Sequence, residues 1–286
     1  MAKCFLYNLG GVGLYKLIAI DLDGTLLDNN KKISRENLDT INMLIKKGYE
    51  IVIATGRRYW SAKELTKEID GHMTILANNG NIVRNSENDQ ILIEKYLNIE
   101  DFRVVVSEGR KRNLHPIVHI NGYEEGFDII LEFHKQADDY LIKDNRYKRV
   151  NNYLEIKDDR ILAVVYTGTK SLIHSFNKDI NERFTNRYNT HVMENIQSVE
   201  AFMEVMHPLG SKWLSLVEYA KKIKINPEEI IAIGDDNNDI DMIKNSGLGI
   251  AMKNASFRAR SVAKIITEKD NDESGVAFEL KRVLSI

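Results

Sequence analysis

An apolar run that ends in two aspartates is the feature that most constrains how this chain can fold. Residues 17–20 (LIAI) are apolar and rich in β-branching, the pattern of a strand buried on both faces. Such strands belong to parallel sheets, which bind their ligands beyond the carboxyl ends of the strands. Asp21 and Asp23 would lie there, where two carboxylates repel unless a cation or a shared proton lies between them. Taken alone, the segment is more typical of a strand that ends in an acidic surface turn than of a ligand site. The rest of the chain decides between these two interpretations.

Strands and helices alternate in the segments that follow. One helix is expected between the N-cap Ser34 and the stop at Gly48, and a second helix ends at Gly71. Further buried strands are expected at residues 51–54, 73–77, 230–233 and 248–250, with a helix over 211–223. This alternation predicts an α/β fold with a doubly wound, Rossmann-like parallel sheet.

The alternation is interrupted after Gly80. Residues 82–83 and 91–93 flank a polar turn and have the pattern of a hairpin, and the chain up to about Asn195 mixes helices and strands. An insert is tolerated where both of its ends emerge from one loop. We therefore expect a leader over residues 1–15, a core over 16–82 and 196–286, and an inserted α/β domain over 83–195.

Composition narrows the classes of partner and compartment. The 286 residues are 43% hydrophobic and 29% charged, as in ordinary globular proteins, and the net charge of −2 provides no field that would concentrate nucleic acid or an anionic membrane. The single cysteine, Cys4, excludes an intramolecular disulfide and favours a reducing compartment. Glycines interrupt the apolar patch at the N-terminus, which argues against a signal peptide. We expect a cytoplasmic monomer or weak homo-oligomer with no nucleic-acid or membrane partner.

Polar residues follow three of the predicted strands. Asp21 and Asp23 follow the first strand, Thr55 the second, and the acidic run 234–239 (GDDNND) the fourth. The carboxyl ends of parallel strands meet at one edge of a sheet, so these side chains should share one crevice. Carboxylates at this density call for a divalent cation, and oxygen ligands without a Cys/His cluster favour Mg²⁺ over Zn²⁺. Such a site binds phosphate oxygens, with Thr55, backbone N–H groups after Asp21 and a lysine as donors.

Four segments, in this order, resemble the signature motifs of the haloacid dehalogenase-like phosphohydrolases. They are residues 21–25 (DLDGT), 55–57 (TGR), Lys212 and 234–239 (GDDNND). Residues 78–80 (NNG), 209–212 (LGSK), 251–255 (AMKNA) and 275–277 (GVA) are similar to the Cof-type subfamily, which carries a large inserted cap. The resemblance extends from about Lys16 to the C-terminus.

The resemblance implies a role for each of these residues. Asp21 would attack phosphorus and form an aspartyl-phosphate, and Asp23 would act as the acid and then the base. Thr55 and Lys212 would orient and neutralise the phosphate oxygens. Mg²⁺ would be held by Asp21, the backbone carbonyl of Asp23 and Asp235, with Asp239 holding Lys212 or a metal-bound water. Further contacts to the substrate or its phosphate would come from Leu22, Gly56, Arg57, Asn238 and Asn254.

The leading function is therefore a Mg²⁺-dependent phosphatase for a small phosphorylated metabolite, such as a sugar phosphate, nucleotide or cofactor phosphate. A phosphomutase and a non-catalytic phosphate-sensing protein remain open as alternatives. Two departures from the subfamily bear on substrate fit: Asp236 stands where an uncharged residue is common, and Trp213 where glycine is common. His115 and His119 have the spacing of a zinc site on a helix, but Pro116 and β-branched neighbours favour a strand.

Overall fold

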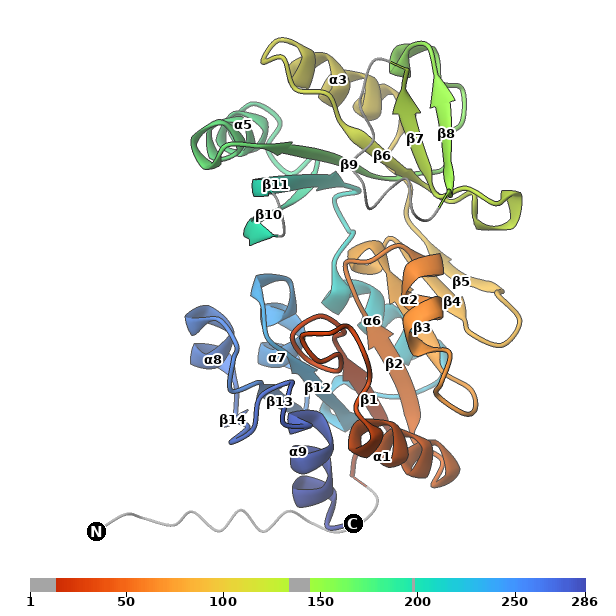
Figure 1. The fold of residues 1–286 in the computed structure, drawn as a ribbon, viewed down its shortest axis with the longest axis vertical. Helices are drawn as coiled ribbons and strands as arrows, with labels where there is room; N and C mark the ends of the chain where they lie inside the picture. The colour runs from red at the N-terminus through yellow and green to blue at the C-terminus, as the bar shows by residue number, and fades with distance from the viewer. Residues whose placement is uncertain (1–13, 134–144, 197–198) are drawn as a thin grey trace.

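The computed structural model describes residues 14–133, 145–196 and 199–286, and it divides them between two sheets (Figure 1). The predicted leader, residues 1–15, lies almost entirely outside the described residues. The larger sheet has eight strands in the order β14-β13-β12-β1-β2-β3-β4-β5, and the smaller has six in the order β10-β11-β9-β6-β7-β8. Within the described residues no helix is both long and apolar enough to cross a membrane.

The eight-stranded sheet and its helices form the larger unit, here called the core. Its strands are β1 Leu17–Ile20, β2 Glu50–Ala54, β3 Thr74–Ala77, β4 Ile82–Asn85, β5 Ile91–Glu94, β12 Ile230–Gly234, β13 Leu248–Ala251 and β14 Ile265–Ile266. Its helices are α1 Arg35–Lys46, α2 Tyr59–Thr66, α6 Lys212–Lys222, α7 Ile240–Asn245, α8 Phe257–Val262 and α9 Gly275–Leu284, with short 3₁₀ turns η1 Asn78–Gly80, η4 Pro227–Glu229 and η5 Asn237–Asp239. All pairings from β14 to β3 are parallel, and the hairpin β4–β5 adds antiparallel strands at one edge.

Helices cover both faces of this sheet, which confirms the doubly wound α/β fold. Ile18 and Ile20 of β1 pack in one buried cluster with apolar residues of α1 and α9, whereas Leu17 and Ala19 pack in another with α6. Both faces of β1 are therefore removed from water, as its unbroken apolar sequence predicts. Ser34 caps α1 by accepting a hydrogen bond from the backbone N–H of Asn37, at 3.2 Å.

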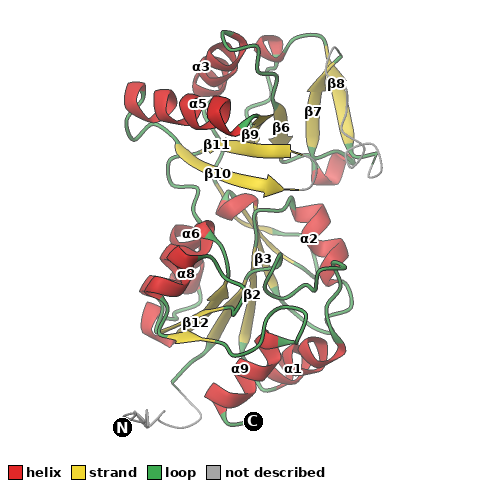
Figure 2. Cartoon of the chain, turned by 60° about the vertical axis from the view of Figure 1, so that its left-hand side comes forward, coloured by secondary structure: helices red, strands yellow, loops and turns green. Residues whose placement is uncertain are grey.

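The smaller α/β unit, here called the cap, comprises the elements from 99 to 206. Its helices are α3 Ile99–Arg110 and α5 Lys170–Arg183, and its 3₁₀ turns are η2 Tyr123–Glu125 and η3 Tyr153–Glu155. Its strands are β6 Ile117–Ile120, β7 Ile129–Glu132, β8 Tyr147–Val150, β9 Ile161–Gly168, β10 Asn189–Ile196 and β11 Val199–Met206. Figures 1 and 2 show the cap above the core, built around its own sheet. The strand at β6 agrees with the interpretation of the His115–His119 segment as a strand.

The boundaries of the insert differ from the predicted 83–195. The hairpin β4–β5 extends the core sheet, where Thr74 pairs with Asn85, and β11 at 199–206 pairs with β9 and β10 in the cap. A hairpin pattern specifies the pairing of its own two strands and not the sheet that they join. The sequence therefore located the hairpin correctly, but the predicted boundary at residue 83 places it in the insert, whereas its strands extend the core sheet.

Candidate active site

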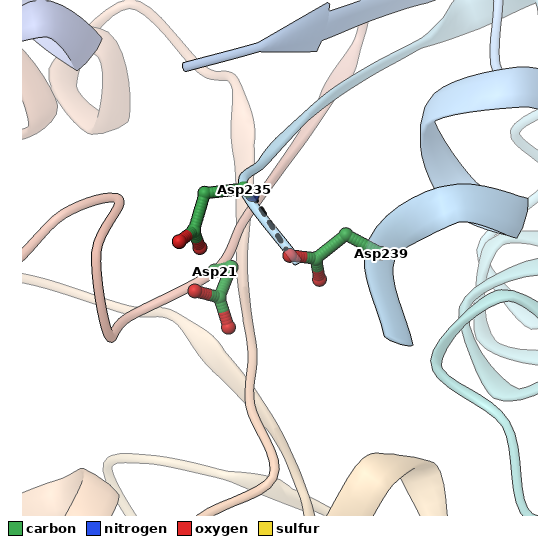
Figure 3. Close-up of side chains that lie close together, drawn as sticks. All are labelled: Asp21, Asp235 and Asp239. Atoms are coloured by element: carbon green, nitrogen blue, oxygen red, sulfur yellow. Dashed lines mark hydrogen bonds between the residues drawn. The ribbon is translucent and has the colours of Figure 1, made fainter. Parts of the chain in front are cut away.

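Three aspartates converge where β1 and β12 end. Ile20 pairs with Ile233 in adjacent parallel strands, so Asp21 and the loop after Gly234 emerge side by side. One carboxylate oxygen from each of Asp21, Asp235 and Asp239 lies within 4.8 Å of the others. Figure 3 shows the three side chains close together, with Asp21 below Asp235 and Asp239 to the right of both. The structure thus brings together three of the four residues predicted to serve the metal.

Lys212 joins this cluster from the first turn of α6. Its Nζ lies 2.7 Å from Oδ1 of Asp21 and 2.7 Å from Oδ1 of Asp239, and the side chain is buried. Burial lowers the pKa of Lys212, but the two carboxylates outweigh burial and raise it, so the lysine is charged. Gly80 lets α6 approach, because a Cβ there would lie 2.6 Å from the carbonyl oxygen of Ser211.

Asp239 is fixed by its own loop. Its Oδ2 accepts hydrogen bonds from the backbone N–H groups of Asp235 (2.9 Å) and Asp236 (3.1 Å), while its Oδ1 receives Lys212. Asp236 and Asp239 form a reciprocal capping box around η5. This explains the extra acid at position 236, since an aspartate side chain caps this turn.

Asp235 lies against the turn that follows Asp21. Thr25 Oγ1 donates to Asp235 Oδ1 at 3.0 Å, and Gly24 has a φ of 77°. A Cβ on Gly24 would collide with the Asp235 carboxylate, so both the backbone angle and the close approach require glycine. Burial raises the pKa of Asp235, and the nearby charges of Asp21 and Asp239 raise it further. The same cause, burial, raises the pKa of Asp21 against the opposing charge of Lys212.

The Asp23 carboxylate binds two cationic side chains, Arg57 and Lys31, and not the aspartate cluster. Arg57 forms a bidentate pair with its carboxylate, from Nε to Oδ2 at 2.6 Å and from a terminal nitrogen to Oδ1 at 2.7 Å, and Lys31 Nζ reaches Oδ1 at 2.7 Å. Burial raises the pKa of Asp23, but these two cations dominate and lower it to about 2. In this arrangement Asp23 is ionised, and Arg57, predicted as a phosphate contact, binds Asp23.

The remaining predicted residues form the loops around the cluster. The buried Thr55 accepts the backbone N–H of Arg57 at its Oγ1, at 3.1 Å, so its hydroxyl proton stays available to an acceptor. Asn254 donates to the carbonyl oxygen of Gly24 at 2.8 Å. The side chain of Leu22 is buried in the core cluster, which leaves its backbone as the part that faces the loop.

Asn79 belongs to the segment 78–80 that resembles the Cof-type subfamily, but no role at the site was predicted for it from the sequence. Its Oδ1 accepts from Nδ2 of Asn238 at 2.8 Å, and it packs beside Gly56, where a Cβ would lie 3.4 Å from its side chain. Asn78, Asn79 and Gly80 all have positive φ, at 48°, 53° and 91°. Two asparagines and a glycine directly after a strand are the residues that tolerate this conformation, so the signal was present in the sequence.

Comparison with known proteins agrees with this geometry. The sequence pattern of the haloacid dehalogenase-like hydrolase family matches residues 18–280. Phosphatase YwpJ of Bacillus subtilis (strain 168) is 28% identical over 290 residues, covering 94% of this chain and 100% of that protein. The same organism's 5-amino-6-(5-phospho-D-ribitylamino)uracil phosphatase YcsE is 29% identical over 267 residues, covering 93% and 94%.

A solved structure supports the fold over the same length. The crystal structure of a haloacid dehalogenase-like hydrolase from Bacteroides thetaiotaomicron matches with a TM-score of 0.78 and 28% identity, covering 94% of this chain and 99% of that one. The predicted enzyme class, a phosphoric monoester hydrolase, is confirmed by the family and by relatives named as phosphatases. Motif order, fold and the family pattern over nearly the whole chain agree, and this chain belongs to the haloacid dehalogenase-like hydrolases, with the features of their Cof-type subfamily.

Proposed function

We propose that this chain is a Mg²⁺-dependent phosphatase that hydrolyses a small phosphorylated metabolite through an aspartyl-phosphate at Asp21. The observation that carries the proposal is the buried lysine that links Asp21 to Asp239 beside a third carboxylate, Asp235. Lys212 holds the Asp21 carboxylate in one orientation and favours its ionised, nucleophilic form. A buried constellation of this kind suits a reaction that depends on positioning and charge neutralisation.

The donor set fits a hard divalent cation. Among the described residues, Lys212 engages Oδ1 of Asp21 and Thr25 engages Oδ1 of Asp235, which leaves Oδ2 of each carboxylate for a metal. Both oxygens of Asp239 already receive protein donors, so we assign Asp239 to holding Lys212 rather than to the metal. Burial raises the pKa of the Asp235 carboxyl, and the neighbouring charges of Asp21 and Asp239 raise it further; a bound cation would relieve that repulsion. Bound Mg²⁺ would supply charge neutralisation at the phosphoryl oxygens, held by Asp21, Asp235 and the backbone carbonyl of Asp23.

Asp21 and Asp23 would divide the chemical work. An Asp21 oxygen forms a bond to phosphorus as the bond to the leaving oxygen breaks, and a proton from Asp23 neutralises that oxygen. Asp23 then takes a proton from the water that hydrolyses the aspartyl-phosphate. The ionised form held by Arg57 and Lys31 is competent for this second step. The first step needs a protonated Asp23, so the ion pair with Arg57 must open when substrate enters. We therefore assign Arg57 the role of positioning Asp23 and not of binding phosphate.

The surrounding loops would bind the phosphate. Thr55 offers its hydroxyl proton, and Leu22 and Gly56 offer backbone N–H groups. Asn238 and Asn254 would act by holding loops, since their side chains bond to Asn79 and to the carbonyl of Gly24. A small phosphorylated substrate also agrees with the near-neutral net charge, and the single cysteine supports our proposal of a cytoplasmic location.

Phosphate release from a panel of phosphorylated sugars, nucleotides and cofactors tests this function, measured with Mg²⁺ and with EDTA. We expect release only with Mg²⁺, and its loss in Asp21→Asn, because an amide is not a nucleophile. Asp241→Asn is the matched control, since Asp241 is exposed on α7. Full turnover in EDTA or in Asp21→Asn would refute the proposal, and isomerisation without phosphate release would favour the phosphomutase.

A further inference from the structure

Two polar residues of the cap lie opposite each other on neighbouring strands. His191 of β10 pairs directly with Glu204 of β11 in the antiparallel register, so both side chains lie on the same face of the cap sheet. The other face of β10 carries Glu194, which contacts His174 of α5 at 2.7 Å. Since α5 packs on that other face, His191 and Glu204 point away from the cap helices.

Glu204 points toward the catalytic loops of the core. It is 5% exposed, and Nδ2 of Asn79 donates to its Oε2 at 2.6 Å. Asn79 in turn accepts from Asn238, in the loop that carries Asp235 and Asp239. Burial raises the pKa of Glu204 overall, although the Asn79 hydrogen bond and the charge of Lys212 both lower it in part. A cap carboxylate is therefore held at the edge of the catalytic cluster.

His191 has a ring nitrogen that lacks a partner. Its Nε2 is shielded from solvent and forms no hydrogen bond with any described residue. Buried polar atoms normally form hydrogen bonds, so an unpaired buried nitrogen indicates that a ligand group is its partner. Burial lowers the pKa of His191, and the charges of Asp236, Lys212 and Asp239 all act on it. The ring is therefore neutral and close to the catalytic cluster.

Buried apolar residues lie next to this pair on the same face of the cap sheet. Val165 of β9 pairs with Glu204 on the side away from His191, and Met206 lies two residues along the same face. Both belong to the apolar cluster Ile117, Ile129, Leu131, Ala163, Val165 and Met206. A carboxylate and a neutral imidazole beside apolar side chains suit a carbon chain that carries hydroxyl groups.

We infer that His191 and Glu204 are specificity-determining residues that bind hydroxyl groups on the leaving group of the phosphomonoester. The inference rests on the proposed phosphatase function and adds to it the substrate class, a hydroxylated carbon chain or ring. Glu204 accepts a hydroxyl proton with the oxygen that Asn79 does not occupy, and Nε2 of His191 pairs with a second hydroxyl. A site built for hydroxyl groups rejects an analogue that lacks them, because its polar atoms are then buried without partners.

Three five-carbon esters test the inference: xylitol 5-phosphate, pentyl phosphate and 5-aminopentyl phosphate, with p-nitrophenyl phosphate as the reference substrate. We expect wild type to prefer the xylitol ester. His191→Leu and Glu204→Leu should each lower kcat/KM for that ester roughly 10- to 100-fold, mainly through KM, because each removes a buried hydrogen bond. The loss for pentyl phosphate and p-nitrophenyl phosphate should be several-fold smaller than the loss for the xylitol ester, because these two esters have no hydroxyl contact to lose.

His174→Leu and Glu194→Leu are the matched controls, because they make the same changes on the far side of the cap sheet. If a leucine variant fails to fold, His191→Phe and Glu204→Met replace it, because neither side chain can pair with a hydroxyl group, and they should show the same selective loss for the xylitol ester. Equal loss for all substrates, or an unchanged preference for the xylitol ester, would overturn the inference. Preference for the aminopentyl ester would also overturn it, in favour of an amine site. If Asp21-dependent hydrolysis of p-nitrophenyl phosphate persists in these cases, the proposed function stands and only this inference fails.

Discussion

Replacing Glu204 by glutamine should stabilise the folded protein at pH 8 and much less at pH 5. Glu204 is 5% exposed, and burial, opposed by the Asn79 hydrogen bond and the charge of Lys212, raises its pKa from 4.5 to about 7. Between these values the folded protein binds more protons than the unfolded chain, so stability falls as pH rises through this window. The penalty is absent below about pH 4 and complete above about pH 8.

The difference between 4.5 and about 7 corresponds to about 3 kcal/mol of unfolding free energy. Glutamine removes the titration but keeps an oxygen that can accept the Asn79 amide. The assay is urea unfolding of wild type and Glu204→Gln at pH 5 and pH 8. The gain in the variant should be larger at pH 8 by about 2–3 kcal/mol, and any pH-independent effect of the new amide cancels.

Glu194→Gln on the neighbouring strand is the control. Glu194 is exposed, and its hydrogen bond to His174 lowers its pKa, so neutralising it should give no gain at pH 8. An equal effect of Glu204→Gln at both pH values would show that Glu204 ionises normally and would refute the reasoning.

Three further substitutions test how the site is held. Lys212→Met should lower the unfolding free energy by about 3–5 kcal/mol and abolish turnover, because two buried carboxylates lose their shared cation. Denaturant unfolding measures this loss, and an unfolding midpoint equal to that of wild type would contradict it. Arg57→Ala should raise the pKa of Asp23 from about 2 toward its ordinary value, so the acidic limb of the pH–rate profile should move to higher pH; an unmoved limb would speak against the pair. Gly24→Ala should weaken Mg²⁺ activation at least roughly 10-fold, because its Cβ would collide with Asp235; a magnesium titration of activity that overlays wild type would contradict this.

Features fixed by strand order could be predicted from the sequence. Asp21 and the acidic run at 234–239 each follow an unbroken apolar strand, and parallel strands place their carboxyl ends together. Lys212 was found through its family resemblance, since an isolated lysine at a helix start carries no local signal of burial. The capping box of Asp236 could also have been predicted, because the acids at 236 and 239 are three residues apart, the spacing of a capping box.

Contacts between distant side chains could not be predicted in this way. Asn79 and Glu204 are 125 positions apart, one in the turn after core strand β3 and the other on cap strand β11, so no local pattern links them. The Arg57–Asp23 pair joins a residue predicted as a phosphate contact to one predicted as the acid and base, and neither role indicated an ion pair between them. The orphan nitrogen of His191 becomes visible only when its surroundings are known, because burial is a property of the packed cap.

Identification of the phosphorylated residue tests the central assignment most directly. The enzyme is mixed with p-nitrophenyl phosphate and Mg²⁺, quenched in acid during turnover, digested, and analysed by mass spectrometry. We predict phosphate on Asp21 in wild type and more of it in Asp23→Asn, where the base for hydrolysis is missing, and none in Asp21→Asn. Phosphate on another residue, or near-native turnover by Asp21→Asn, would contradict the assignment of Asp21 as the nucleophile.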